Sequence, residues 1–76
     1  MPVPVDPLLM AKTESARLRT IADAAIAPLQ DAVDLEVATP SEIDALKAWK
    51  RYRVALNRLP EQPGFPEMID WPDLPA

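Results

Sequence analysis

Proline placement constrains this chain more than any other sequence feature. Ten of the 76 residues are proline, and each lacks a backbone N–H and has a fixed φ angle. Pro2 and Pro4 exclude a helix at the start, because each also biases the preceding residue toward extended geometry. Five further prolines lie within residues 60–76. Helices are therefore confined to about residues 7–59.

The first helix is predicted over about residues 8–35. Asp6 can cap its free N–H groups, and Pro7 suits the first helical position. Pro28 removes the backbone hydrogen bond to Ala24, at about 3 kcal/mol. The apolar stripe keeps its phase across Pro28, so we expect one helix with a kink at residues 24–28. The stripe consists of Leu18, Ile21, Ala22, Ala25, Ile26, Leu29 and Val33.

The second helix begins with the strongest local signal in the sequence, TPSE at residues 39–42. Thr39 can cap the helix, and Glu42 can reach back to the Thr39 N–H, which makes a capping box. Pro40 suits the first helical position, and the helix is predicted to run to about Arg58. Its apolar face carries Ala45, Trp49, Tyr52, Leu56 and Leu59.

The connection between the two helices is short, so they should lie antiparallel. The predicted fold class is all-α: an antiparallel helical hairpin with a long kinked first helix, a shorter second helix and an extended Pro-rich C-terminal tail. This divides the chain into an extended leader (1–6), a hairpin (7–59) and a tail (60–76). The tail carries more apolar residues than a disordered segment would, so it should pack on the hairpin or on a partner. These residues are Phe65, Met68, Ile69, Trp71 and Leu74.

The residue types exclude most kinds of catalytic site. The chain has no cysteine and no histidine, which excludes the usual zinc sites and Cys–His or Ser–His nucleophiles. Pairs of acids such as Asp31 with Asp34 lack the cleft that hydrolytic carboxylates need, and no calcium-loop pattern is present. We therefore expect no enzyme activity, no cofactor and no metal. No apolar run reaches membrane-spanning length and no secretory signal is visible, so we expect a soluble intracellular protein without a membrane partner.

Charge is unevenly distributed along the chain. Residues 1–44 have three basic and eight acidic residues (−5), residues 45–59 have five basic and none acidic (+5), and residues 60–76 have four acidic and none basic (−4). The net charge of −4 argues against a nucleic-acid partner. We expect the segments to pair with each other inside the fold.

The basic side chains of the second helix allow two interpretations. Lys47, Lys50, Arg51 and Arg58 share one helical face, which is either solvated or steers an acidic partner. Arg53 lies nearer the apolar face. From hairpin geometry, we expect it to pair with a carboxylate of the first helix such as Asp31 or Asp34.

Three motifs resemble one protein family. IAPLQDAVDL at residues 26–35, WKRYRVALNR at residues 49–58 and IDWP at residues 69–72 are similar to the C-terminal domain of the tail fibre assembly proteins of tailed bacteriophages and prophages. The likeness extends in order over about residues 14–76. The second and third motifs are the specific ones.

The resemblance implies a chaperone that helps a trimeric tail fibre protein to fold or assemble. Family members bind the C-terminal, receptor-facing end of the fibre, which implies a stoichiometric complex with a fibre trimer. It also implies a place in the host bacterial cytoplasm and, in some phages, on the finished fibre tip. The candidate partner-binding residues are Trp49, Tyr52, Arg53, Leu56, Arg58, Phe65, Ile69 and Trp71. Of these, Trp49, Tyr52 and Trp71 could equally serve as packing residues of this chain.

Two departures from the family pattern stand out. Members usually carry a separate domain before this region, whereas Met1 here stands near its start, so a short member and an excised fragment both remain open. Many members have glycine where this chain has Glu36. A left-handed Glu36 would cost roughly 1–2 kcal/mol, so we expect the turn to be built differently.

Two other functions remain open on the residues alone. A small acidic inhibitor or antitoxin-like protein of a phage or prophage could imitate nucleic acid with its acidic segments. A structural subunit could form a homo-oligomer through an exposed hairpin face.

Overall fold

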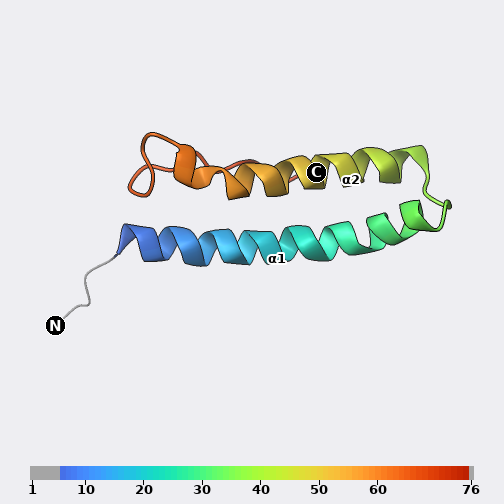
Figure 1. The fold of residues 1–76 in the computed structure, drawn as a ribbon, viewed down its shortest axis with the longest axis horizontal. Helices are drawn as coiled ribbons and strands as arrows, with labels where there is room; N and C mark the ends of the chain where they lie inside the picture. The colour runs from blue at the N-terminus through green and yellow to red at the C-terminus, as the bar shows by residue number, and fades with distance from the viewer. Residues whose placement is uncertain (1–5, 76) are drawn as a thin grey trace.

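The protein is an antiparallel pair of helices. The computed structural model describes residues 6–75, which form α1 (Pro7–Asp34), α2 (Pro40–Asn57) and a short 3-10 helix, η1 (Leu59–Glu61). The two long helices lie side by side and run in opposite directions (Figure 1). The predicted all-α helical hairpin is therefore confirmed. The predicted leader falls mostly on residues 1–5, which lie outside the described residues.

Both long helices start where the local sequence predicts. The Asp6 carboxylate accepts a hydrogen bond from the Leu8 N–H at 3.0 Å. At the start of α2, the Thr39 N–H donates to the Glu42 carboxylate at 2.9 Å, and the Glu42 N–H donates to the Thr39 hydroxyl at 3.2 Å. These bonds satisfy N–H groups that have no partner within the helix. These capping bonds set the first residue of each helix.

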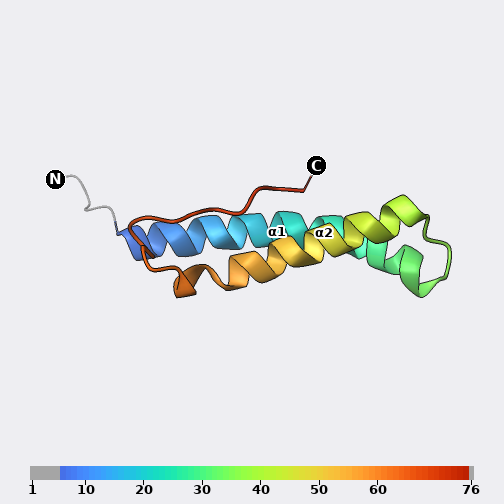
Figure 2. The same cartoon turned by 90° about the horizontal axis from the view of Figure 1, so that it is seen from above.

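Pro28 lies inside α1 without ending it. Figure 2 shows the last turns of α1 leaving the straight line of the earlier ones, toward the connection with α2. A proline in a helix interior produces such a bend, because its ring displaces the carbonyl four residues before it. The expectation of a single helix is correct.

The turn after α1 is built around a left-handed glutamate. Glu36 has a φ of 61°. Its N–H donates to the Val33 carbonyl at 3.0 Å, and the Val37 N–H donates to the Ala32 carbonyl at 2.9 Å. This is the Schellman arrangement that normally uses glycine. The expectation of a different turn was wrong, because the hydrogen bonds and the short connection hold Glu36 in the strained conformation.

The core is a single seam between the helices. Its central cluster, referred to below as the core cluster, consists of Leu18, Ala22, Tyr52, Leu56 and Leu59. Two details differ from the predicted faces. Ile21 is 36% exposed at the edge of the seam, and Leu46 rather than Ala45 is the buried residue near the start of α2.

The register of the hairpin decides which charges meet. Arg53 pairs with Asp23 of α1 at 3.1 Å, so the expected pairing with a carboxylate of the first helix is correct, but the expected partners Asp31 and Asp34 were wrong. Asp31 lies eight residues closer to the turn than Asp23, which is about 12 Å along the helix. In an antiparallel hairpin, a residue far from the turn on α2 meets a residue equally far from it on α1.

The remaining basic residues of α2 make no such pair. Among residues 6–75, the ion pairs are Arg53 with Asp23 and Arg17 with Glu14. The expected internal pairing of the charged segments is therefore wrong for Lys47, Lys50, Arg51 and Arg58 within this range. No helix in the described part of the chain is long and apolar enough to cross a membrane.

Candidate partner-binding surface

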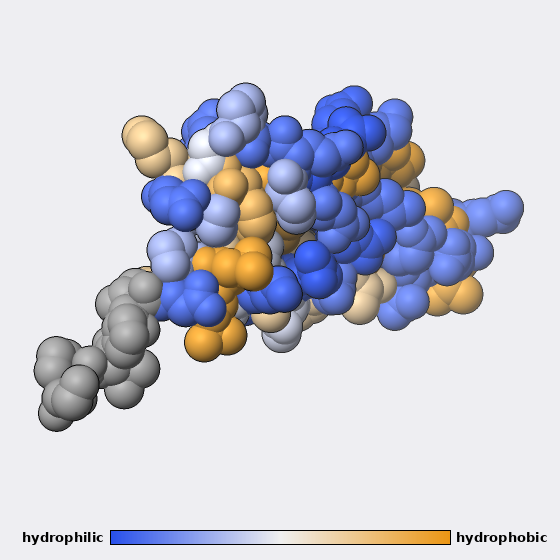
Figure 3. Space-filling model, turned by 60° about the vertical axis from the view of Figure 1, so that its left-hand side comes forward, coloured by the Kyte–Doolittle hydropathy of each residue, from blue (hydrophilic) through white to orange (hydrophobic). Residues whose placement is uncertain are grey.

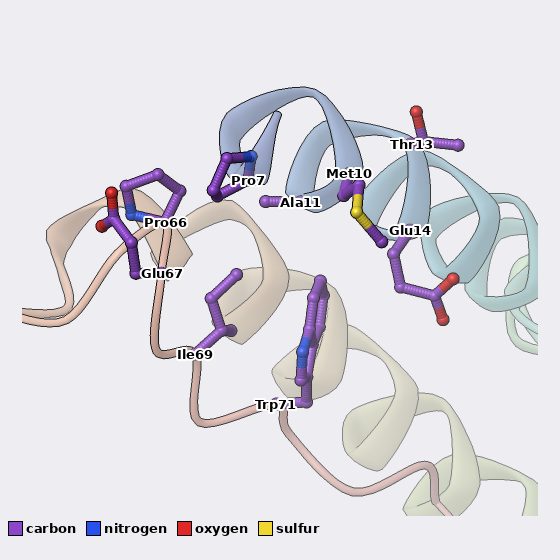
Figure 4. Close-up of a pocket in the computed structure, with 9 residues that line it drawn as sticks. All are labelled: Pro7, Met10, Ala11, Thr13, Glu14, Pro66, Glu67, Ile69 and Trp71. Carbon is purple, nitrogen blue, oxygen red and sulfur yellow. The ribbon is translucent and has the colours of Figure 1, made fainter. Parts of the chain in front are cut away.

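The structure contains an apolar groove where the tail passes the first turns of α1. Figure 2 shows the segment after η1 crossing this end of the hairpin and then running back along the helices. The groove has a volume of about 760 Å³. We call it the α1–tail groove (Figure 4), and it is lined by Pro7, Met10, Ala11, Thr13, Glu14, Pro66, Glu67, Ile69 and Trp71.

Beside the groove, the first turn of α1 exposes further apolar side chains. Met10 is 59% exposed, and its neighbours Leu8 and Leu9 are also exposed. Figure 3 shows apolar surface gathered at the end of the molecule where α1 begins. Large exposed apolar side chains that cluster, instead of lying singly, are typical of protein-binding sites.

The tail side of the groove is held by contacts within the chain. Ile69 and Trp71 pack against the core cluster. Between these two residues, the backbone of Asp70 is hydrogen-bonded to the Gln62 side chain. Inside this loop, a Cβ added to Gly64 would lie 2.6 Å from the Met68 carbonyl oxygen. Glycine is therefore required there for the loop to close.

Acidic side chains stand beside the apolar lining of the groove. Glu14 accepts two hydrogen bonds from the Arg17 guanidinium, at 2.6 and 3.0 Å. These bonds hold the pKa of the Glu14 carboxyl below its ordinary value. Glu67 contributes a second carboxylate. The arrangement suits an apolar side chain with a polar or basic neighbour, and it offers no paired groups for proton or nucleophile chemistry.

The predicted partner-binding residues fall into three environments. Tyr52 and Leu56 are buried in the core cluster, and Trp49 is partly buried beside them. The Trp49 and Tyr52 rings meet edge to face, with centroids 5.8 Å apart and an angle of 86° between planes. These three residues therefore build the hairpin, which is the packing role considered from the sequence.

The other candidates lie nearer the surface. Phe65, Ile69 and Trp71 are partly buried against the core cluster, Arg53 is half-exposed and paired with Asp23, and Arg58 is exposed. The α1–tail groove brings Ile69 and Trp71 together and includes none of the other six candidates. Sequence reasoning missed the α1 half of the groove. Ala11 continues the apolar stripe seven residues before Leu18, which was the available signal.

Tyr52 carries an unusual hydroxyl group. The residue is 4% exposed, and its hydroxyl has no hydrogen-bond partner among the described atoms. Burial raises the pKa of Tyr52 above its ordinary value, and the nearby Arg17 charge partly opposes this. An unpaired buried hydroxyl costs roughly 1–3 kcal/mol, so this group works against stability.

Comparison with known proteins gives one consistent family. The family described as "Caudovirales tail fibre assembly protein, lambda gpK" matches residues 3–76. The chain is 49% identical over 65 residues to the prophage tail fiber assembly protein homolog TfaR of Escherichia coli (strain K12), which covers 86% of this chain and 33% of that protein. It is 48% identical over 66 residues to the tail fiber assembly protein of Escherichia phage lambda, covering 87% of this chain and 33% of that protein.

A third relative is more similar over a shorter stretch. It is a probable tail fiber assembly protein of Acyrthosiphon pisum secondary endosymbiont phage 1, with 60% identity over 50 residues, covering 66% of this chain and 31% of that protein. The chain thus spans about a third of the length of these relatives. No solved structure matches the chain.

Proposed function

This chain belongs to the tail fibre assembly protein family of tailed bacteriophages, and we propose that it is a non-enzymatic chaperone for a tail fibre protein. It binds the C-terminal, receptor-facing end of the trimeric fibre and promotes folding or assembly there. Its proposed place is the host bacterial cytoplasm during assembly, with retention on the finished fibre tip as a further expectation.

One observation carries this proposal. The family match covers residues 3–76, and relatives in several phages and prophages are named for tail fibre assembly. The fold agrees with a binding role, since the surface includes an apolar groove and exposed apolar side chains beside it.

The α1–tail groove supplies a physical means for such binding. An unassembled fibre chain exposes apolar side chains that its two companions later cover. Burying one leucine- or phenylalanine-sized side chain contributes about 1.5–3 kcal/mol. A groove lined by Met10, Ile69 and Trp71 can shelter such a side chain until the trimer forms, which lowers the population of aggregation-prone intermediates.

The test is co-expression with a tail fibre protein of the same phage or prophage. We expect soluble, trimeric fibre to increase when the chain is present, measured by size-exclusion chromatography with light scattering. Equal yields with and without the chain would refute the chaperone function. Recovery of a nuclease or toxin in place of a fibre in a pull-down would favour the inhibitor function instead.

A matched pair of variants tests the groove. Met10→Glu introduces charge at the α1–tail groove, and Leu35→Glu makes the same change at the 72% exposed Leu35 beside the hairpin turn. We expect Met10→Glu to reduce fibre yield and Leu35→Glu to leave it unchanged. If both variants match the original chain, the fibre binds elsewhere.

A further inference from the structure

A second surface lies on the side of α2 that faces away from the core. Lys47, Lys50, Arg51 and Arg58 are all exposed there, and Val54 stands among them with 44% of its surface exposed. These positions share one helical face. Tyr52 and Leu56, which belong to the core cluster, lie on the opposite side of the same helix. We call this surface the basic face.

The basic face is hollowed at its centre. A depression of about 520 Å³ is lined by Lys50, Arg51, Val54, Ala55, Arg58 and Gln62. Val54 and Ala55 give it an apolar floor, and three cationic side chains stand around that floor. Such a site fits an apolar side chain flanked by carboxylates, because guanidinium groups pair with carboxylates in a bidentate geometry.

The cations of the basic face have no carboxylate partner within the described residues. Among residues 6–75, none of the four forms an ion pair, although the chain has twelve acidic residues. Lys47 is also three and four residues from Lys50 and Arg51, and like charges at these spacings destabilise a helix. The repulsion between these cations therefore lowers the stability of the helix, and no ion pair of theirs within residues 6–75 offsets it.

We propose that the basic face docks an acidic patch on the tail fibre protein, in which Asp or Glu side chains surround one apolar side chain. This inference rests on the proposed chaperone function and specifies the chemistry of its partner. The fibre carboxylates pair with Lys50, Arg51 and Arg58, and the apolar side chain covers Val54. Complementary charge of this kind steers the encounter and fixes the orientation of the two proteins.

The rest of the chain favours a protein partner over a nucleic acid. The net charge is −4 and the sequence pI is about 4.5, whereas nucleic-acid-binding domains are usually basic overall. The basic face has no aromatic side chain to stack on a base, since Trp49 and Tyr52 pack toward the core cluster. An apolar floor under a ring of cations suits a protein surface better than a phosphate backbone.

The test measures the affinity of the complete chain for a tail fibre protein of the same phage or prophage, by calorimetry over a series of salt concentrations. The double variant Lys50→Glu/Arg51→Glu reverses two of the four charges of the basic face and removes its net positive charge. Lys12→Glu/Arg19→Glu reverses two exposed cations on α1 and changes the net charge equally. We expect the first to lower affinity about tenfold at low salt and to flatten the salt dependence, because it removes attractive pairs at an interface. The control should differ from the original chain by less than about twofold.

The outcomes of this experiment separate the docking role of the basic face from the chaperone function. Equal affinity for both double variants overturns the basic face as a docking site while leaving the chaperone function intact. No binding by the original chain refutes the function and this inference together. If a DNA or RNA oligonucleotide binds in a way that needs Lys50 and Arg51, and fibre binding does not need them, the acidic protein partner is wrong. Melting curves check folding, and Lys50→Gln/Arg51→Gln repeats the test if charge reversal unfolds the chain.

Discussion

The side-chain amide of Gln62 forms two hydrogen bonds with the backbone of Asp70. Its Nε2 donates to the Asp70 carbonyl at 2.8 Å, and its Oε1 accepts from the Asp70 N–H at 2.9 Å. The amide thus occupies the place that a peptide group of a neighbouring strand would take. This pairing closes the loop between the two residues and sets the position from which Ile69 and Trp71 reach the core cluster.

Replacing Gln62 should release the tail. Gln62→Ala removes both hydrogen bonds and is expected to lower the free energy of unfolding by about 1–2 kcal/mol. It should also increase the exposure of Trp71, which tryptophan fluorescence and quenching would report. Gln30→Ala is the control, because the Gln30 amide bonds only within α1, to Asp34. Equal effects of the two variants would mean that Gln62 does not hold the tail.

A glycine at position 36 should stabilise the hairpin. Glu36→Gly removes the left-handed strain of roughly 1–2 kcal/mol but adds freedom to the unfolded chain that offsets about 0.4–1 kcal/mol. The expected net gain is about 0.5–1 kcal/mol in urea unfolding. Glu36→Ala keeps the Cβ and removes the charge, so it should give no comparable gain. A gain from alanine equal to that from glycine would point to charge instead of strain.

Removing the Tyr52 hydroxyl should not lower the free energy of unfolding. Tyr52→Phe keeps the ring and deletes an unpaired buried group, so stability should rise by roughly 1–3 kcal/mol. Tyr52→Ala deletes the ring as well and should lose about 3–5 kcal/mol. Thermal and urea unfolding of the two variants separate these effects. A clear loss in the phenylalanine variant would show that the hydroxyl has a bonding partner in solution.

Ionisation of the buried Tyr52 hydroxyl should lower the stability of the fold at alkaline pH. Burial raises the pKa of Tyr52 above its ordinary value of 10.0, so the folded state keeps its proton to higher pH than the unfolded state. The raised pKa therefore affects the free energy of unfolding only at alkaline pH. This free energy keeps its full value below pH 10 and falls as the pH rises through the folded-state pKa of Tyr52. Tyr52 is the only tyrosine, so tyrosinate absorbance follows it directly. The Tyr52→Phe variant should lose less stability over the same range, and parallel losses would contradict the raised pKa.

The helix starts could be predicted from the sequence because they depend on near neighbours. Asp6 and Thr39 cap N–H groups two or three residues away, and such bonds form wherever the local chain is helical. The continuity of α1 through Pro28 followed in the same way from the phase of its apolar stripe. The α1–tail groove could be predicted only in part, since Ile69 and Trp71 were recognised as candidates but their α1 partners were not.

The sequence alone is enough to predict two capped helices, a short connection that folds them back on each other, and an apolar tail with too many prolines to be helical. Local hydrogen bonds and side-chain periodicity suffice for these features. The left-handed Glu36 is a local feature of the turn, and its residue type gave no signal for that conformation. The pairing of Arg53 with Asp23 and the packing of the tail beside the first turns of α1 became evident only in the folded chain. These depend on the register between the helices and on side-chain packing between distant segments, which no short stretch of sequence encodes.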